Sequence, residues 1–378
     1  MLKIYFTAST NESPYGKQYK KIIQLIKLHK AEVLSGEQIV NTALLKQDKQ
    51  LSAEQIHERE KNLIAQADAV VAETTAPSLG VGAEIEYALS LNKPVLALLQ
   101  IEHEDRLSPL ISGNPSDTLF LEYYQEDNLR FVLGNFFTHV TKTKNRKGKL
   151  IVIDGGDGSG KTTQAQLLVE YLKKHKIPVK YMDFPQYYQS FHGKVVAQFL
   201  RGEFGNIHQV SPYLASLAYA LDRASVKQEM EDFLNKGGYI IANRYATSNM
   251  AHQGAKFPHA KEREEYLKWV YELEYKVHKI PKEDLVIYLS VPWEIGAQLT
   301  DKKGDRKYLK GKTADIHETD TDHRQKAQEM YLKLAQENKH WITIDCVTKG
   351  KILPIEKIQE KILTILKKEE LLNTSSTT

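Results

Sequence analysis

The strongest chemical signal in the chain is a glycine-rich segment that ends in lysine and threonine, Gly155-Gly156-Asp157-Gly158-Ser159-Gly160-Lys161-Thr162. It matches the pattern G-x-x-x-x-G-K-[ST], in which glycines allow backbone N–H groups to converge on phosphate oxygens. An apolar run, Leu150–Ile153, precedes the segment, and an amphipathic stretch, Thr163–Lys174, follows it. Because a helix N-terminus adds positive potential, this context favours a nucleotide site between a strand and a helix.

The types of the last two residues specify the chemistry of that site. Lys161 is expected to reach the β- and γ-phosphates of ATP, and the Thr162 hydroxyl is expected to lie on Mg²⁺. A glycine turn that only joined a strand to a helix would leave this lysine–threonine pair unexplained. We therefore expect ATP as co-substrate and Mg²⁺ as cofactor. The expected ATP-binding residues are Gly155, Gly156, Asp157, Gly158, Ser159, Gly160, Lys161, Thr162 and Thr163.

The composition limits the class of protein. A length of 378 residues favours two domains, and 41% hydrophobic with 26% charged residues is typical of a globular protein. The net charge of +4 is mild, whereas nucleic-acid-binding proteins concentrate more positive charge, so small nucleotides are the expected partners. The single cysteine, Cys346, excludes an intrachain disulfide and is expected to be buried. No apolar run has the length of a membrane span or a signal peptide, so a cytoplasmic protein without membrane contact is expected.

Strand-like and helix-like stretches alternate in both halves, which predicts α/β units with parallel sheets. In the first half, a capping box at Ser52–Gln55 opens a helix to about Gln66, and another helix is expected near Glu84–Leu91, after a glycine-containing loop. The expected strands of this half are Lys3–Thr7, Ala31–Leu34, Ala69–Ala72 and Pro94–Leu99. Those of the second half are Leu150–Asp154, Val179–Asp183, Tyr239–Asn243, Leu285–Val291 and Trp341–Asp345.

A polar, basic stretch separates the two halves. Residues 141–148 lack apolar periodicity, which favours a solvated linker over a phosphate-binding patch. The expected organisation is a first domain over residues 1–140, this linker, a second domain over residues 149–370, and a disordered tail over residues 371–378, which is rich in serine and threonine at its end.

The second domain resembles the thymidylate kinase family over about residues 148–368. The resemblance is carried by Gly155–Gln166, Asp183-Phe184-Pro185, Leu217–Arg223 and Asn243–Gln253. It implies a P-loop nucleoside-monophosphate kinase fold and the phosphorylation of dTMP to dTDP by ATP. In that family the residue matching Asp157 binds the 3′-hydroxyl, the one matching Tyr219 stacks on thymine, the one matching Arg223 reads O4, and the one matching Arg244 holds the phosphate. The implied dTMP-binding residues are Asp157, Phe184, Tyr219, Arg223, Arg244 and Gln253, and the implied catalytic residues are Lys161, Arg244 and Arg306.

Three positions depart from the family pattern. Asn243 replaces the acid of the Asp-Arg-Tyr motif, for which Asp154 and Asp183 are possible substitutes. Gln186-Tyr187 replaces a Glu-Arg pair, and Gly158 stands where some relatives carry an arginine that stabilises the transferring phosphoryl group. Enzymes without that arginine usually take it from a mobile lid. The resemblance implies a lid at 301–310 in which Arg306 or a neighbouring lysine supplies the charge, and the alternative is a solvated surface loop.

The first domain, over about residues 2–138, resembles the nucleoside 2-deoxyribosyltransferase superfamily and most of all its 2′-deoxynucleoside 5′-phosphate N-hydrolase branch. The resemblance is carried by Tyr5, Ala67–Glu73, Ala76–Glu84 and Asn92–Val95. It implies a flavodoxin- or Rossmann-like parallel sheet, with Glu84 as nucleophile on C1′, Asp68 as acid/base or ribose-orienting group, and Tyr5 as positioner of the carboxylate. This chemistry parallels glycoside hydrolysis. The implied deoxynucleotide-binding residues are Tyr5, Ser9, Asp68, Ser78, Gly80, Gly82, Glu84 and Ser108.

The same resemblance implies a homodimer, because the family's counterpart of Ser108 contacts phosphate in a neighbouring subunit. Two positions depart from it: Asn11 replaces a phosphate-binding arginine, and a pocket histidine is replaced near Glu37. Glu84 could also be an exposed helix carboxylate like Glu86. The leading interpretation is a bifunctional enzyme, a dTMP kinase joined to a deoxynucleotide N-glycosidase. The alternatives are a kinase with a degenerate N-terminal nucleotide-binding or dimerisation module, and an N-terminal deoxyribosyltransferase.

Overall fold

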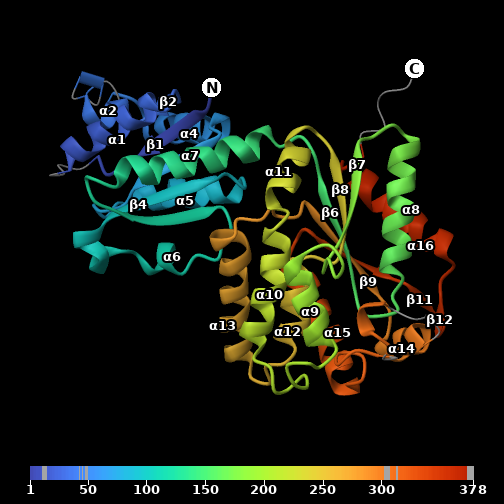
Figure 1. Cartoon of the computed structure of the whole chain (residues 1–378). Helices are drawn as coiled ribbons and strands as arrows, with labels where there is room; N and C mark the ends of the chain where they lie inside the picture. The colour runs from blue at the N-terminus through green and yellow to red at the C-terminus, as the bar shows by residue number, and fades with distance from the viewer. Residues whose placement is uncertain are drawn as a thin grey trace. The chain divides into compact units, whose positions relative to one another are not determined.

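The computed structural model describes residues 1–10, 15–41, 43–44, 46, 50–301, 307–311 and 314–372. The chain divides into two compact units, Met1–Asn145 and Arg146–Thr378, and each contains its own five-stranded sheet (Figure 1). All neighbouring strands in these two sheets run parallel. The expected α/β fold with two parallel sheets is confirmed.

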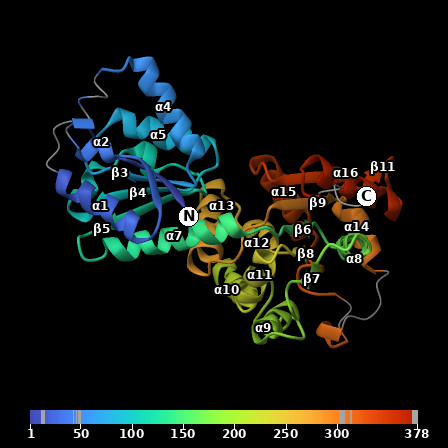
Figure 2. The ribbon, with the colours of Figure 1, turned by 90° about the horizontal axis from the view of Figure 1, so that it is seen from above.

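The sheet of the first unit has the strand order β2-β1-β3-β4-β5, which is the order of flavodoxin-like folds. Alternate side chains of β1 point to opposite faces. Ile4 and Phe6 pack with α1 and α7, whereas Tyr5 packs with α4 and α5, and Figure 2 shows these helix pairs on the two sides of the sheet. The strands are β1 Lys3–Thr7, β2 Glu32–Ser35, β3 Ala69–Glu73, β4 Val95–Gln100 and β5 Leu119–Tyr124. The helices are α1 Gly16–Leu28, α2 Glu37–Val40, α4 Ala53–Gln66, α5 Leu79–Ser90, η1 Ile101–Arg106, α6 Pro109–Ser112 and α7 Leu129–Asn145.

The sheet of the second unit has the order β10-β9-β6-β8-β7, and a short antiparallel hairpin of β11 and β12 follows it. Ile151 and Ile153 pack against α8 and α16, while Leu150 and Val152 face the core under α12 and α15. The strands are β6 Leu150–Asp154, β7 Val179–Asp183, β8 Tyr239–Asn243, β9 Leu285–Ser290, β10 Trp341–Asp345, β11 Val347–Thr348 and β12 Lys351–Ile352. The helices are α8 Lys161–Lys174, α9 Phe191–Leu200, α10 Pro212–Ala224, α11 Lys227–Asn235, α12 Ala246–Gly254, α13 Ala260–Tyr271, η2 Glu272–Val277, α14 Trp293–Asp301, η3 Lys307–Leu309, α15 Thr321–Glu337 and α16 Ile355–Lys368.

Two expected boundaries differ from the structure. Residues 141–145 of the expected linker continue α7, because no proline or glycine interrupts the helix before Gly148 and its last-turn lysines complement the helix dipole. The expected disordered tail begins too early, since Leu371 and Leu372 are buried with α8 and α16 in one apolar cluster. The rest of that tail, residues 373–378, lies outside the described residues.

The start of α5 also differs from the prediction. This helix begins at Leu79, so the glycine-containing segment before Glu84 is its first turn and not a loop. Ser78 explains the start, because its hydroxyl accepts a hydrogen bond from the Val81 N–H at the helix N-terminus. In the described part of the chain, no helix combines the length and the apolar character needed to cross a lipid bilayer.

Candidate functional site

The candidate site of the second unit begins at the glycine loop, Gly155–Gly160, between β6 and α8. Lys161 at the start of α8 is only 7% exposed, and its ammonium donates to the carbonyl of Gly156 at 2.7 Å. A Cβ at Gly158 would lie 2.1 Å from the backbone oxygen of Gly296 in α14, and its φ is +81°. The glycine loop therefore has no room for the arginine that some relatives carry at this position.

Arg244 occupies the position directly after β8 and faces the glycine loop. Its φ is +65°, a left-handed value that non-glycine residues adopt rarely. One guanidinium nitrogen forms an ion pair with Asp157, and another donates to Nε2 of His252 at 3.1 Å. Although burial opposes ionisation, Arg244 and Lys161 hold the pKa of Asp157 below its usual value. Asp157 and Lys161 of the glycine-rich segment and Arg244, which follows β8, thus lie around one charged site.

A group of oxygen atoms lies beside Thr162 at the ends of β7 and β8. The side-chain amide of Asn243 donates to the Thr162 hydroxyl at 3.1 Å and to Asp183 at 2.8 Å. The Asn243 Oδ1 atom is buried and has no hydrogen-bond partner among the residues that the structure describes. Carboxylate, amide and hydroxyl oxygens are the donors that Mg²⁺ prefers, so this set fits a magnesium ion.

Asp154 is not a second candidate for that role. It is fully buried at the end of β6, and its carboxylate accepts hydrogen bonds from the Gly155 N–H and from the hydroxyls of Thr247, Ser248 and Tyr331. These donors occupy its oxygens. Of the two possible substitutes for the missing acid, only Asp183 is placed beside Thr162.

Aromatic side chains form the next part of the site. Tyr219 on α10 packs edge-to-face on Phe199 at a centroid distance of 6.4 Å. Tyr187 stacks on Tyr308 of η3 at 4.2 Å with an interplanar angle of 7°. The described part of the expected lid therefore covers Tyr187. Arg306, the expected lid arginine, lies outside the described residues, as do Lys302 and Lys303.

Three of the expected dTMP-binding residues, Arg223, Phe184 and Gln253, are almost fully buried, and each has different surroundings. Arg223 forms a two-pronged ion pair with the buried Glu274, and it also donates to the carbonyl of Tyr245. Its guanidinium is thus engaged by protein and is not presented to a base. Phe184 is 2% exposed and packs on Tyr245 in the core, so it supports the site from behind. Gln253 is 1% exposed, and within the described ranges of the chain its Oε1 atom has no hydrogen-bond partner.

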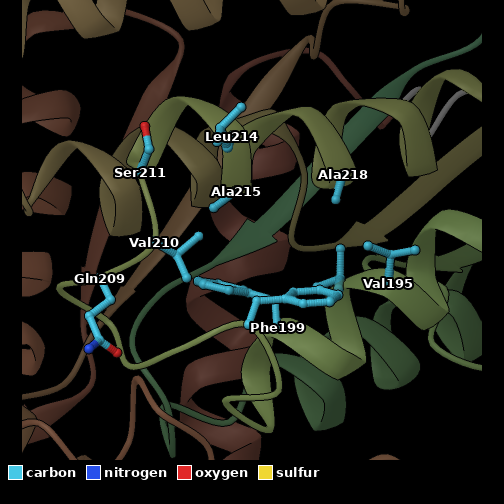
Figure 3. Close-up of a pocket in the computed structure, with 10 residues that line it drawn as sticks. Val195, Phe199, Gln209, Val210, Ser211, Leu214, Ala215 and Ala218 are labelled. Carbon is cyan, nitrogen blue, oxygen red and sulfur yellow. The ribbon is translucent and has the colours of Figure 1, made fainter.

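An apolar pocket of about 330 Å³ lies between α9 and α10, with Phe199 in its wall (Figure 3). Its lining includes Val195, Val210, Leu214 and Ala218 and only two polar side chains, Gln209 and Ser211. None of the charged residues around the glycine loop lines this pocket. It has the composition of a packing space and not of a phosphoryl-transfer site.

The candidate site of the first unit is a pair of carboxylates that share one hydroxyl. The Tyr5 hydroxyl lies 2.9 Å from Glu84 Oε1 on α5 and 2.7 Å from Glu60 Oε2 on α4. Thr7 donates to the other Glu84 oxygen at 2.5 Å, and Ser35 donates to Glu60 at 3.3 Å. Burial and the two carboxylates raise the pKa of Tyr5, so its hydroxyl stays protonated and can act as the donor.

The ionisation of Glu84 is tuned by these neighbours. Burial raises the pKa of Glu84, hydrogen bonds from Thr7 and Tyr5 lower it, and the negative charge of Glu60 raises it further. The carboxylate is therefore held by two donors in a partly buried position, which suits a nucleophile that must be anionic but weakly hydrated.

Asp68 does not belong to this site, which corrects the expectation from the sequence. Its carboxylate pairs with Lys144 and accepts the Lys3 N–H, both at 2.7 Å, before β3 begins. Thr7, which contacts Glu84, lies at the opposite end of β1. Four residues of strand separate Lys3 from Thr7, or roughly 13 Å at 3.3 Å per residue. Glu60 takes the second carboxylate position instead.

Glu60 carries a signal in the sequence that the motif comparison missed. It falls four residues after Ile56 and four residues before Ile64 in α4, so it shares a helix face with these apolar residues, and Ile64 is buried in the core. A carboxylate in the apolar stripe of a helix is costly unless donors meet it, which marks it as a candidate functional group.

The serines and glycines of the first unit lie in separate places. Ser78 caps α5, whose first turn contains the exposed Gly80 and the half-buried Gly82. Ser108 caps the four-residue helix α6, and Ser9 is buried two residues after β1. The backbone N–H groups at the start of α5 point out of the N-terminal end of the helix, and Glu84 lies in the second turn, close to this end.

Comparisons with known proteins divide the chain in the same way. Residues 153–362 match the family model for thymidylate kinase, and residues 4–119 match the model for nucleoside 2-deoxyribosyltransferase. A thymidylate kinase of Plasmodium falciparum is 30% identical over 204 residues, which are 54% of this chain and 85% of that relative.

The relatives of the first unit align with this chain over fewer residues but with higher sequence identity. A putative 2′-deoxynucleoside 5′-phosphate N-hydrolase 1 of Nematostella vectensis is 45% identical over 84 residues, 22% of this chain and 57% of the relative. A 5-hydroxymethyl-dUMP N-hydrolase of Tetraodon nigroviridis is 40% identical over 85 residues, 22% of this chain and 60% of the relative. The chain thus spans less than two thirds of the length of these two relatives.

Proposed function

The chain belongs to the thymidylate kinase family, and from this membership we propose that its second unit transfers the γ-phosphoryl group of ATP to the 5′-phosphate of dTMP. The observation that supports this most is the grouping of Lys161, Asp157 and Arg244 at the glycine loop. Lys161 is suited to neutralise charge on the β- and γ-phosphates of ATP. Arg244 is suited to grip the acceptor phosphate, since a guanidinium binds phosphate through two parallel hydrogen bonds.

Mg²⁺ is the cofactor in this proposal. Thr162, Asp183 and the unpaired Oδ1 of Asn243 are the residues that would hold it, directly or through water. The ion would neutralise charge on the phosphates during transfer. Asp183 then supplies the negative charge that Asn243 lacks.

Recognition of the base is proposed to depend on Tyr219 and Gln253, because Arg223 is engaged with Glu274. Tyr219 offers an aromatic face for stacking. The unpartnered Oε1 of Gln253 is a buried acceptor that could meet the N3–H of a pyrimidine. An ADP-release assay over a range of dTMP concentrations tests this role. Tyr219→Ala should raise the KM for dTMP, since a stacking contact contributes roughly 1–3 kcal/mol, and an unchanged KM would contradict it.

For the first unit we propose hydrolysis of the N-glycosidic bond of a deoxynucleoside 5′-monophosphate. The observation that supports this is the Tyr5 hydroxyl shared by Glu60 and Glu84. Glu84 is proposed to attack C1′ and form a glycosyl-enzyme intermediate. Glu60, whose carboxylate also pairs with Arg59, is proposed to act in its anionic form and to activate the water that releases the sugar, while the departing base takes its proton from solvent. Contacts of 2.7 and 2.9 Å to one hydroxyl keep the carboxylates closer than the about 6.5–9.5 Å of inverting glycosidases.

Product analysis in a water–methanol mixture tests this mechanism. A double displacement through Glu84 predicts a methyl glycoside with the configuration of the substrate, and Glu84→Ala should abolish base release. Adding a free acceptor base to the same reaction separates hydrolysis from deoxyribosyl transfer. A chain that releases no base from any deoxynucleotide would favour the non-catalytic module. Homodimer formation remains a prediction, which analytical ultracentrifugation of the full chain tests.

A further inference from the structure

Three buried histidines form a cluster directly behind Arg244. They are His252 on α12, His317 in the turn before α15, and His323 in the first turn of α15, and they are 9%, 6% and 4% exposed. One ring nitrogen from each lies within 4.8 Å of those of the other two. The rings of His252 and His317 are stacked at 5.4 Å, and those of His317 and His323 lie at 4.7 Å. Among the described residues, this is the group of His, Cys, Asp and Glu side chains with the spacing of metal ligands.

The hydrogen bonds of the cluster fix where its protons lie. Arg244 donates to Nε2 of His252 at 3.1 Å, and a guanidinium can only donate, so this nitrogen carries a lone pair. The proton of His252 is therefore on Nδ1, which lies 3.4 Å from Nε2 of His323. Nε2 of His317 is buried and has no hydrogen-bond partner in the described structure. The cluster thus offers a lone pair of His323 and an unpartnered nitrogen of His317 to its interior.

This geometry is close to that of a zinc site. Zn–N bonds of about 2.0–2.1 Å in a tetrahedron place ligand nitrogens on the order of 3.4 Å apart, and the His252–His323 pair has a 3.4 Å separation. The remaining separations, within 4.8 Å, need a contraction of on the order of 1 Å. Neutral imidazoles suit Zn²⁺, Co²⁺ and Ni²⁺, whereas Mg²⁺ prefers oxygen. We propose that His252, His317 and His323 bind a transition-metal ion of the Zn²⁺ class, at a site distinct from that of Mg²⁺.

The charges around the cluster set the strength of this site. Arg244 and Lys256 are positive and oppose a divalent cation, while Asp157 and Asp320 are negative and offset them. The Lys256 ammonium is buried and has no hydrogen-bond partner in the described part of the chain. It lies over the ring of Phe199, which His317 also contacts. Removing this ammonium should therefore strengthen metal binding.

Metal binding also has a consequence for Arg244. A metal on Nδ1 of His252 requires the proton of that ring to move to Nε2, which can then no longer accept from Arg244. The metal and the Arg244–His252 hydrogen bond are mutually exclusive. Since we have proposed that Arg244 grips the acceptor phosphate, the metal should weaken dTMP binding, and dTMP should weaken metal binding by the same factor.

Metal binding itself can be measured without any enzymatic turnover. The untagged full chain is stripped with a chelator and dialysed against Co²⁺ in excess Mg²⁺, and the visible absorption of Co²⁺ and the bound metal per chain are recorded. We expect one Co²⁺ per chain with the intense spectrum of a tetrahedral site, displaced by Zn²⁺. His317→Asn and His323→Gln should each weaken binding by more than the about 10–100-fold that the loss of a hydrogen-bond partner of a ligand costs, because each change removes a ligand itself. His175→Asn, which changes an exposed histidine on the turn after α8, should not alter it.

Lys256→Met should have the opposite effect on metal affinity: this variant should bind Co²⁺ more tightly than the wild type. Thermal unfolding of each variant separates a lost ligand from a lost fold. Wild-type protein that binds no Co²⁺, or folded cluster variants that bind it as tightly as wild type, would overturn the site. Loss of binding in both cluster variants, with a wild-type dTMP affinity that Zn²⁺ leaves unchanged, would keep the site and overturn its coupling to Arg244. Because the spectrum needs no phosphoryl transfer, failure of the kinase proposal would be seen separately.

Discussion

At the scale of single residues, the Tyr5 hydroxyl shared by Glu60 and Glu84 predicts two substitutions that shift the pKa of Glu84 in opposite directions. The charge of Glu60 raises the pKa of Glu84, and the Tyr5 hydrogen bond lowers it. Glu84 must be anionic to attack C1′, so base release should fail as the pH falls through its pKa. Glu60→Gln should therefore move the acidic limb of kcat/KM to lower pH, and Tyr5→Phe should move it to higher pH.

The measurement is the pH profile of kcat/KM for base release in both variants and in Glu86→Gln, an exposed change on the same helix. Glu60→Gln should also lower the maximal rate if Glu60 activates the water that releases the sugar, but the position of the limb is independent of that loss. Limbs that coincide in all three variants would contradict the assignment of Glu84 as the titrating nucleophile.

The pair of Arg223 and Glu274 gives a second prediction at this scale. Both side chains are almost fully buried and pair in two-pronged geometry. Removing one partner leaves an uncompensated buried charge, which costs about 3–5 kcal/mol. Glu274→Ala should therefore lower the free energy of unfolding of the second unit by that amount, while the double change Arg223→Met with Glu274→Leu should recover most of it.

Tryptophan fluorescence during urea unfolding measures this loss, because all three tryptophans, Trp269, Trp293 and Trp341, lie in the second unit. A base-reading Arg223 would behave differently. In that case Arg223→Met would raise the KM for dTMP and leave the unfolding midpoint close to that of the wild type.

At the scale of elements, the C-terminal end of the chain is anchored more firmly than its composition suggests. Leu371 and Leu372 are buried in the apolar cluster of α8 and α16, and the Tyr239 hydroxyl donates to the carbonyl of Leu371 at 2.8 Å. Leu371→Ala should destabilise the second unit by about 2–5 kcal/mol, by loss of burial and creation of a cavity. The same tryptophan signal measures it, with Leu214→Ala on the exposed face of α10 as control. Equal unfolding midpoints for the two variants would contradict this anchoring.

Most strands could be predicted from the sequence, because the central strands are continuous apolar runs and the strand β10 at the end of the sheet alternates apolar and polar residues. β6, β7, β8 and β10 have the predicted boundaries. The end of α7 and the start of α5 could not be predicted in the same way. The stretch after Val140 is polar and basic like a linker but contains no residue that breaks a helix. In α5, Gly80 and Gly82 suggested a loop, although the Ser78 cap starts the helix before them.

The site was predictable where a motif fixes neighbours in the sequence and less so where tertiary contacts decide. Lys161 and Thr162 follow from one contiguous pattern. Asp68 lies at the amino ends of the parallel strands β1 and β3, whereas the Glu84 site lies at the carboxyl end of β1. The sequence alone does not show this, because it depends on the pairing of the strands. Glu274, the partner that engages Arg223, is 51 residues away from it in the sequence and no local pattern joins them.

At the scale of the whole molecule, the two units should lose their activities separately. Lys161 and Glu84 lie in different compact units. Lys161→Ala should abolish ATP-dependent phosphorylation of dTMP and leave base release intact, and Glu84→Ala should do the reverse. Both activities are measured on one preparation, ADP formation by a coupled assay and free base by chromatography. Loss of both activities from either change in a folded chain would contradict independent sites.

The joining of the two activities also predicts how their substrates differ. If both units preferred dTMP, the hydrolase would consume the acceptor of the kinase. We therefore expect the hydrolase to act best on a deoxynucleotide that the kinase phosphorylates poorly. The measurement is kcat/KM for both reactions across normal and 5-modified deoxynucleoside monophosphates. A common preference for dTMP would refute this expectation.

The close approach of Gly158 and Gly296 limits which substitutions the glycine loop can accept during evolution. A side chain at Gly158 would collide with the backbone of α14, and one at Gly296 would lie 2.4 Å from the backbone oxygen of Asp157. A single mutation that introduced arginine into the glycine loop would thus displace either the loop or the helix. Arginine at this position therefore needs a compensating shift of the loop or of α14, and a charge supplied from elsewhere in the chain is the more accessible solution.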